Sequence, residues 1–242
     1  KKLKEFMKNI LKFLKNNLKR YSNMISGGMR RPVLSTASWM KSFDSDPSKA
    51  IKHFWENRAT GVRRAKHMDG FSAIISDALD HSRAGVVVER NSKLSGYYRA
   101  NKIWDLVIFD GERLLAAIEY KSQVGSARKN FNNRIEEALG NALDIRMASW
   151  TGKINSCKSP WLGYLFVLED CEETRKKSNR SSVQLNYVES FDKMEQNLYN
   201  STCLLLTSPG NSGMIKGEDS LRRFIIDLVS FIESECGVNA PP

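Results

Sequence analysis

Two short, strongly apolar segments lie close together near the middle of the chain. Residues 103–109 read Ile-Trp-Asp-Leu-Val-Ile-Phe, and residues 114–121 read Leu-Leu-Ala-Ala-Ile-Glu-Tyr-Lys. Runs this apolar predict two central β-strands, and the Asp-Gly that follows the first run predicts a hairpin. The pattern is broken by three ionisable side chains, Asp105, Glu119 and Lys121. Because an unpaired charge in a buried strand is costly, these three side chains indicate a functional site.

The flanking segments predict how this hairpin is built into a sheet. Upstream, residues 71–79 follow a helical stripe and residues 86–90 read as a short strand. Downstream, residues 131–150 predict a helix and residues 162–168 a buried strand. The order is therefore helix, three strands, helix, strand, which is an α/β fold, and the crossover predicts parallel pairing of the last two strands. The predicted packing residues of the downstream helix are Ile135, Ala138, Leu139, Ala142 and Met147.

Whether the three ionisable side chains meet depends on the length of the hairpin loop. Side chains alternate between the two faces of a strand, so Glu119 and the lysine two residues later share a face. Asp105 joins them if the loop has an odd number of residues, and we predict a three-residue loop at 110–112 that places Asp105 opposite Ala117. A two-residue Asp-Gly loop would instead send Asp105 to the opposite face.

These residue types suit a metal-dependent phosphodiesterase. Mg²⁺ binds through one or two carboxylates together with phosphate oxygens, so Asp105 and Glu119 are candidate ligands and the carbonyl of Tyr120 is a third. The metal would neutralise charge on the scissile phosphate and provide hydroxide. Lys121 would position the attacking water or stabilise the developing negative charge. The alternative is a buried ion pair between Lys121 and a carboxylate.

Amide and basic side chains crowd the segment after the second strand of the hairpin. Asparagine and glutamine read adenine edges, whereas arginine and lysine read guanine or contact phosphate. The candidate DNA contacts are Ser122, Gln123, Arg128, Lys129, Asn130, Asn132, Asn133 and Arg134. The alternative is an ordinary polar loop in which Asn132 or Asn133 caps the next helix. Glu136, Glu137 and Asp69 are candidate accessory acids, although Asp69 also suits a helix cap.

Several motifs in this region resemble known nucleases. Asp105 on the second strand and Glu119-x-Lys121 on the third resemble the PD-(D/E)xK nuclease core, with Trp104 in place of the nominal proline. More narrowly, four motifs resemble the XhoI family of type II restriction endonucleases. They are Glu-Tyr-Lys-Ser-Gln-Val-Gly at 119–125, Asn-Phe-Asn-Asn-Arg at 130–134, Glu-Glu-Ala-x-Gly at 136–140 and Leu-Glu-Asp-Cys at 168–171. The resemblance covers about residues 53–235.

The resemblance implies a fold, an activity and partners. The implied fold is a PD-(D/E)xK core, a mixed central sheet flanked by helices. The implied enzyme is a homodimer that depends on Mg²⁺ and cuts both strands of double-stranded DNA at a palindromic site, CTCGAG or a close relative. A cognate DNA methyltransferase that protects the host genome is the implied functional partner.

Positive charge is concentrated near the N-terminus. The chain has 242 residues and a net charge of +11, and residues 1–66 hold 17 Lys and Arg against 4 Asp and Glu. We predict a basic extension and linker at 1–50 and a single endonuclease domain at 51–242, with a catalytic core at about 69–170 and a C-terminal strand and helices at about 183–236. The first residues predict a basic amphipathic helix, which is a dispensable extension, a DNA arm or a dimer-contact helix.

Other features of the sequence bear on the cellular compartment of the protein but leave more than one function open. No apolar run is long enough to span a bilayer, so no membrane association is expected. The four cysteines Cys157, Cys171, Cys203 and Cys236 are widely spaced, which favours free thiols in a reducing cytoplasm. The residues allow a sequence-specific restriction endonuclease, a repair or recombination nuclease that recognises DNA structure, or a noncatalytic DNA-binding protein.

Overall fold

A mixed five-stranded sheet forms the centre of the fold. The computed structural model describes residues 47–59, 65–82, 84–178, 181–210 and 220–237. The strands, in spatial order, are β1 (Val87–Leu94), β2 (Lys102–Asp110), β3 (Arg113–Gln123), β4 (Ser156–Glu169) and β5 (Ser201–Thr207). The pairs β1–β2 and β2–β3 are antiparallel, whereas β3–β4 and β4–β5 are parallel. The described residues belong to one compact unit.

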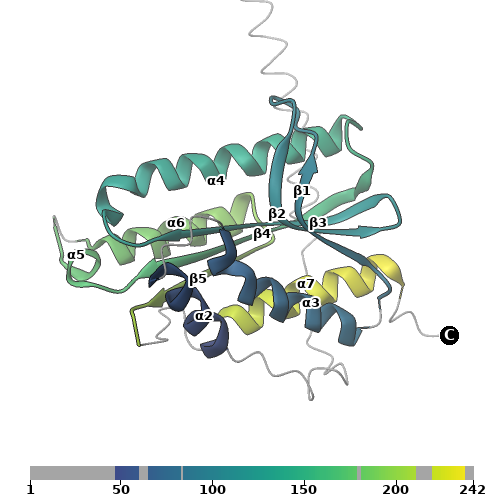
Figure 1. Cartoon of the computed structure of the whole chain (residues 1–242). Coiled ribbons are helices and arrows are strands. Elements are labelled where there is room, and N and C mark those ends of the chain that lie inside the picture. Colours follow the sequence, from purple (N-terminus) through teal and green to yellow (C-terminus); the bar gives the residue numbers. More distant parts are fainter. Residues whose placement is uncertain (1–46, 60–64, 83, 179–180, 211–219, 238–242) are drawn as a thin grey trace, which may run out of the picture. The chain divides into compact units, whose positions relative to one another are not determined.

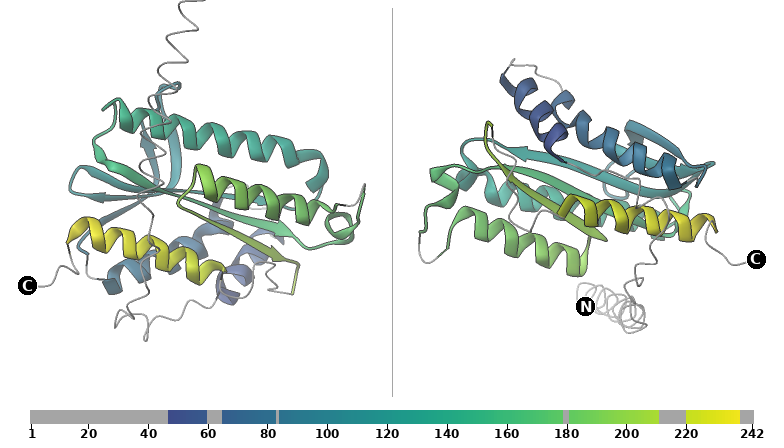
Figure 2. Two further views of the ribbon diagram at one scale, coloured as in Figure 1. Left: turned by 180° about the vertical axis from the view of Figure 1, so that it is seen from behind. Right: turned by 90° about the horizontal axis from the view of Figure 1, so that it is seen from below.

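Helices cover both faces of this sheet (Figures 1 and 2). One face carries α4 (Ala127–Trp150) and α6 (Val183–Asn197), with the short α5 (Glu172–Arg175) between them in the chain. The other face carries α3 (Asp69–Ser82) and α7 (Ser220–Cys236), and α2 (Ser48–Ala59) and the 3-10 turn η2 (Ala65–Met68) pack beside α3. None of the described helices is long and apolar enough to cross a membrane.

The predicted order of elements is confirmed. The helix at 71–79, the strand at 86–90, the helix at 131–150 and the strand at 162–168 correspond to α3, β1, α4 and β4. Parallel pairing across the α4 crossover is also confirmed, with Glu119 opposite Tyr164. The predicted extension at 1–50 lies outside the described residues except for its last four positions, so the domain boundaries stay a prediction.

The inner face of α4 differs from the predicted one. Ala138 and Ala142 are buried as predicted, but Leu139 is exposed and Ile145 and Ala148 complete the packing face. Alanines let the helix lie close to the sheet, so the larger leucine side chain points away from it. The alternative in which Asn132 or Asn133 caps the helix is excluded, because both residues lie inside it. It begins after Ser126, which has a φ of 48° and makes no side-chain cap.

Aromatic side chains fill the core between the sheet and the α4–α6 layer. Tyr164 and Phe166 from β4 contact Tyr187 and Phe191 from α6, with ring centroids 5.0–5.7 Å apart. The four cysteines carry free thiols, as predicted. The hydroxyl of Tyr199 donates a hydrogen bond to the carbonyl of Ala138 at 2.8 Å. By contrast, the buried hydroxyl of Tyr187 has no hydrogen-bond partner among the described residues.

This contrast generates a stability prediction. Tyr187→Phe removes a buried hydroxyl that gains nothing in the folded state, so it should leave the free energy of unfolding unchanged or raise it by up to about 1 kcal/mol. Tyr199→Phe removes a made hydrogen bond to the Ala138 carbonyl, so it should lower that free energy by about 1 kcal/mol. Urea unfolding of both variants measures the difference, and equal losses would contradict it.

Candidate active site

The turn between β2 and β3 differs from the predicted one. Asp110 pairs with Arg113 around a two-residue turn, in which Gly111 has a φ of 58°. The predicted three-residue loop is therefore wrong, and so is the predicted pairing of Asp105 with Ala117, whose observed partner is Val107. The glycine suits this turn because it adopts a positive φ without steric cost.

A bulge in β3 brings Asp105 level with Glu119 in spite of the short turn. The pairing shifts by one residue beyond Phe109–Leu114, because Leu115 is an extra residue without a partner in β2. In the shifted register, position 105 falls opposite position 119. Without the bulge, the two-residue turn would place Asp105 opposite Ile118 and direct the two acids to opposite faces.

The regular pairing of β2 with β3 ends just before Asp105. The last ladder pair is Leu106–Ile118, and the Asp105 carboxylate then accepts a hydrogen bond from the Tyr120 N–H at 2.7 Å. A side chain thus replaces the backbone acceptor that a continued ladder would supply. The N–H and C=O of one residue in an antiparallel ladder point to the same neighbouring strand, so the Tyr120 carbonyl also faces the Asp105 side.

The alternation of side chains between the two faces of β2 is interrupted at Asp105. Trp104 and Val107 both pack into the core under α4, although simple alternation would put them on opposite faces. Opposite this point, Asn91 in β1 has a φ of 53°, which is uncommon for a residue other than glycine. This irregularity places Trp104 and Lys102 on the same side of the sheet as Glu119.

Glu119 is held between two lysines. Its side chain is only 2% exposed, with Oε1 2.6 Å from Nζ of Lys121 and Oε2 2.5 Å from Nζ of Lys102. The Lys102 ammonium also lies over the ring of Trp104, 4.8 Å from its centroid. The sequence did not predict a role for Lys102, because alternation along a regular strand places it on the face opposite Glu119. The predicted proximity of Lys121 to Glu119 is observed in the form of the alternative, an ion pair.

The Asp105 carboxyl is in an environment that resists ionisation. Burial raises its pKa, and the nearby Glu119 carboxylate raises it further, to about 6. The hydrogen bond from the Tyr120 N–H and the charges of Lys121 and Lys102 act in the opposite direction. A divalent cation between the two acids would relieve this repulsion, so the donor set fits a metal.

The rest of the first coordination sphere would come from other oxygens. Among the described residues, no three His, Cys, Asp or Glu side chains gather into a metal site. The Tyr120 side chain points to the opposite face of the sheet, where its hydroxyl accepts a hydrogen bond from Ser72 at 3.3 Å. Only its backbone can serve the site. Mg²⁺ accepts a ligand set of two carboxylates that is completed by a carbonyl, water and phosphate oxygens.

Two of the candidate DNA contacts at the end of β3 are engaged within the protein. The Gln123 amide is buried, donates to the Gly125 carbonyl at 2.5 Å and accepts from Nε of Arg134 at 3.3 Å. The Ser122 hydroxyl lies 3.4 Å from the His67 ring, which η2 brings beside β3. These contacts shape the turn that leads from β3 into α4.

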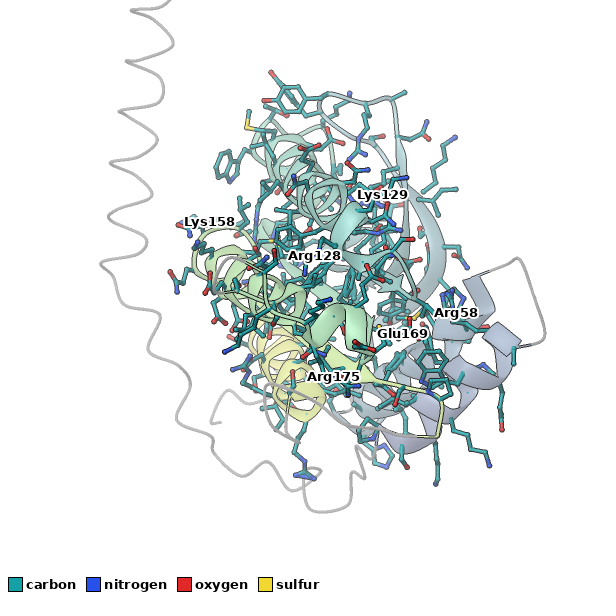
Figure 3. All side chains as sticks on the ribbon, turned by 90° about the vertical axis from the view of Figure 1, so that its left-hand side faces the viewer. Arg58, Arg128, Lys129, Lys158, Glu169 and Arg175 are labelled. Atoms are coloured by element: carbon teal, nitrogen blue, oxygen red, sulfur yellow. The ribbon has the colours of Figure 1, made fainter. Side chains whose placement is uncertain are left out.

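The other candidates occupy the first turns of α4, at the end of the sheet viewed in Figure 3. Arg128 donates to the Lys176 carbonyl at 3.2 Å, and Asn130 bonds the Ser126 carbonyl at 3.2 Å. Lys129, Asn132 and Asn133 are exposed. The structure therefore gathers the amides and cations around one helix start, directly after the strand that carries Glu119 and Lys121.

The accessory acids are not gathered with the central pair. Glu136 and Glu137 are exposed on α4, and Glu137 pairs with Arg134 at 2.9 Å. Asp69 begins α3 on the opposite face of the sheet. Among the described residues, no hydrogen bond or ion pair joins any of the three to Asp105 or Glu119, and their accessory role stays a prediction.

Comparison with known proteins identifies the class. A family model described as restriction endonuclease XhoI matches residues 51–206. The chain is 34% identical over 164 residues to type II restriction enzyme XhoI of Xanthomonas vasicola, covering 59% of this chain and 66% of the relative. It is 31% identical over 205 residues to BstVI of Geobacillus stearothermophilus, covering 73% and 92%. It is 41% identical over 159 residues to AbrI of Azospirillum brasilense, covering 57% and 72%. No solved structure matches.

These matches select the first of the three functions that the sequence left open. The protein is a type II restriction enzyme, a site-specific deoxyribonuclease that hydrolyses DNA. More particularly, the chain belongs to the XhoI family of restriction endonucleases.

The raised pKa of Asp105 generates a prediction for the metal-free protein. A carboxyl whose pKa is raised by folding favours folding while it is protonated, and that contribution is lost as the pH rises through about 6. Asp105→Asn keeps an acceptor for the Tyr120 N–H but carries no charge. In EDTA at pH 7.5, it should raise the melting temperature by roughly 2–4 °C. The gain should vanish near pH 4; a gain that grows on acidification would contradict the assignment.

Proposed function

We propose that this enzyme makes Mg²⁺-dependent double-strand cuts in DNA at a palindromic site, CTCGAG or a close relative. The observation that carries the proposal is the meeting of Asp105, Glu119 and Lys121 where β2 separates from β3. Family membership supports site-specific cleavage of DNA, because relatives with 31–41% identity are type II restriction enzymes.

Asp105, Glu119 and the Tyr120 carbonyl would hold the metal. Bound there, Mg²⁺ would neutralise negative charge on the scissile phosphate and lower the pKa of a bound water. The protein fixes this geometry from its backbone. The Tyr120 N–H orients one carboxylate at 2.7 Å, and the second carboxylate projects from the neighbouring strand in the register set by the Leu115 bulge.

The two lysines have different tasks in this proposal. Lys121 is 29% exposed, so its ammonium can leave Glu119 to orient the attacking water or to stabilise the oxygen that gains charge. Lys102 is 13% exposed and is held against the Trp104 ring. It would remain on Glu119 and hold that carboxylate in its orientation.

DNA would lie across the end of the sheet where β3 passes into α4. Arg128 and Lys129 would contact phosphates, and Asn132 and Asn133 present free amides that can read base edges. The remaining candidates, Ser122, Gln123, Asn130 and Arg134, would support the same surface, since Gln123 and Arg134 bond each other.

The biological setting follows from this activity. A palindromic site presents two equivalent scissile phosphates, so a homodimer with two active sites would cut both strands. An enzyme of this kind would act in the cytoplasm on double-stranded DNA, with a cognate DNA methyltransferase as its functional partner.

Substitution of the central residues tests the assigned roles. Glu119→Ala and Lys121→Ala should each reduce plasmid cleavage by at least about 10³-fold, because each removes a group that acts on the reacting phosphate. Both variants should still bind target DNA in Ca²⁺ by electrophoretic mobility shift. Lys158→Ala, an exposed lysine near the start of β4, is the matched control and should cut normally. Full activity in either central variant would refute its role.

The target is tested by cleavage of plasmid DNA with sequencing of the ends. Wild-type protein in Mg²⁺ should produce discrete fragments whose ends all map to one palindromic hexamer. Addition of EDTA should leave the plasmid intact. Ends scattered over many sequences, or undiminished cleavage in EDTA, would overturn the proposed specificity or the proposed metal.

A further inference from the structure

The loop that joins β1 to β2 presents cations and exposed aromatic rings close to the candidate active site. We infer that this loop, residues 95–101, binds the sugar-phosphate backbone of duplex DNA beside the scissile phosphate, an inference that rests on the proposed function. None of these residues is among the DNA contacts predicted from the sequence. The loop would therefore be a second DNA-binding element, in addition to the start of α4.

The charge in this part of the chain suits a polyanion. Residues 90–102 hold four cations, Arg90, Lys93, Arg99 and Lys102, and no acid. The first three of these are exposed. The tip of the hairpin that carries them extends past α4 (Figure 1). Clusters of Lys and Arg of this kind attract the phosphates of DNA.

A buried carboxylate of α4 holds the loop in one shape. Asp144 is only 3% exposed and accepts hydrogen bonds from the Tyr98 N–H at 2.7 Å and from Arg99 Nε at 2.9 Å. Gly96 lies directly against this carboxylate, because a Cβ built there would collide with it. Since the loop is already ordered by these contacts, binding through it would cost little conformational entropy.

The anchor leaves the side chains that suit phosphate available. The Arg99 side chain is 45% exposed, and among the described residues no hydrogen bond engages its terminal nitrogens. Tyr98 contacts the anchor through its backbone, while its ring is 64% exposed and packs edge to face on Tyr97. Guanidinium groups and tyrosine hydroxyls are common donors to phosphate oxygens. We therefore expect Arg99 and Tyr98 to contact the DNA backbone.

The loop leads directly into the candidate active site. Lys102, the first residue of β2, lies 2.5 Å from Glu119. Arg99 is three residues earlier in the chain, so the two Cα atoms are at most about 11 Å apart. Phosphates along one DNA strand follow one another at about 3.4 Å of helix axis. A strand whose scissile phosphate lies beside Glu119 can therefore reach Arg99 within a few nucleotides of the cut.

Charge and position favour DNA over the other possible occupants of the loop. The first 20 residues of the chain hold eight Lys and Arg against one acid, so the cations of the loop would repel them. Another protein is the second alternative, because exposed tyrosines are enriched in protein interfaces. Only DNA is a partner that the candidate active site itself requires beside Lys102.

DNA affinity in Ca²⁺ tests this inference without cleavage. The assay is fluorescence anisotropy of the full chain with a labelled duplex that contains CTCGAG. Arg99→Ala should weaken binding at least about tenfold and reduce the salt dependence of log Kd by about 0.9, the loss expected for one phosphate contact. A duplex without the site should show the same loss, because a phosphate contact carries no sequence information. Arg223→Ala on α7 is the matched control, since this arginine is 47% exposed and also pairs with a carboxylate.

A second variant leaves the anchor intact. Tyr98→Ala removes the exposed ring but keeps the backbone N–H that bonds Asp144, so the loop should keep its shape. It should weaken binding by about two- to tenfold. The Arg223→Ala control should bind as tightly as wild type. Unchanged affinity in Arg99→Ala or in Tyr98→Ala would overturn the inference.

Neutral phosphates distinguish a direct contact from an altered loop. Duplexes with a single methylphosphonate at successive positions in and beside the site remove one charge at a time. One position should weaken binding of wild type at least about tenfold and leave binding of Arg99→Ala unchanged. The same profile for both proteins would overturn the inference. Because affinity is measured without cleavage, a protein that binds through the loop but fails to cut in Mg²⁺ would refute only the proposed function.

Discussion

The structure depends on the point at which β2 leaves β3. There the Asp105 carboxylate, rather than a backbone carbonyl, accepts the hydrogen bond of the Tyr120 N–H at 2.7 Å. The exchange ends the ladder without leaving a buried donor unsatisfied, which would cost about 1–3 kcal/mol. It also directs an acid and a backbone carbonyl into the opening between two strands. The candidate metal site is thus a consequence of where the pairing of β2 with β3 ends.

The same opening accounts for the charges that gather around it. Burying a carboxylate without a paired cation would be costly. Glu119 can be buried because Lys121 and Lys102 contact both of its oxygens. The Asp105 carboxyl receives less compensation, and burial together with the neighbouring Glu119 carboxylate raises its pKa to about 6. Without a metal, neighbouring cations therefore compensate the Glu119 carboxylate better than the Asp105 carboxyl. Such an arrangement is expected for groups that serve a ligand rather than stability.

Periodicity predicted the elements well but predicted their detailed register poorly. The apolar runs were sufficient to place β2, β3 and β4, and the crossover rule gave their pairing. The bulge at Leu115 has no signature in a run of five apolar residues, so the predicted pairing of Asp105 with Ala117 was wrong, although Glu119 lies near enough to Asp105 to raise its pKa. Lys102 was missed because the alternation of side chains in β2 is interrupted at Asp105. Leu139 was predicted inside because hydrophobicity alone does not show which side of the helix packs on the sheet.

The proposed metal site requires a divalent cation between Asp105 and Glu119. A crystal of the protein with target DNA and Mn²⁺, measured by anomalous scattering, shows whether such an ion is bound there. We expect an anomalous peak within coordination distance of both carboxylates and the Tyr120 carbonyl, and no peak in the Glu119→Ala variant. A peak elsewhere, or an undisturbed peak in that variant, would contradict it.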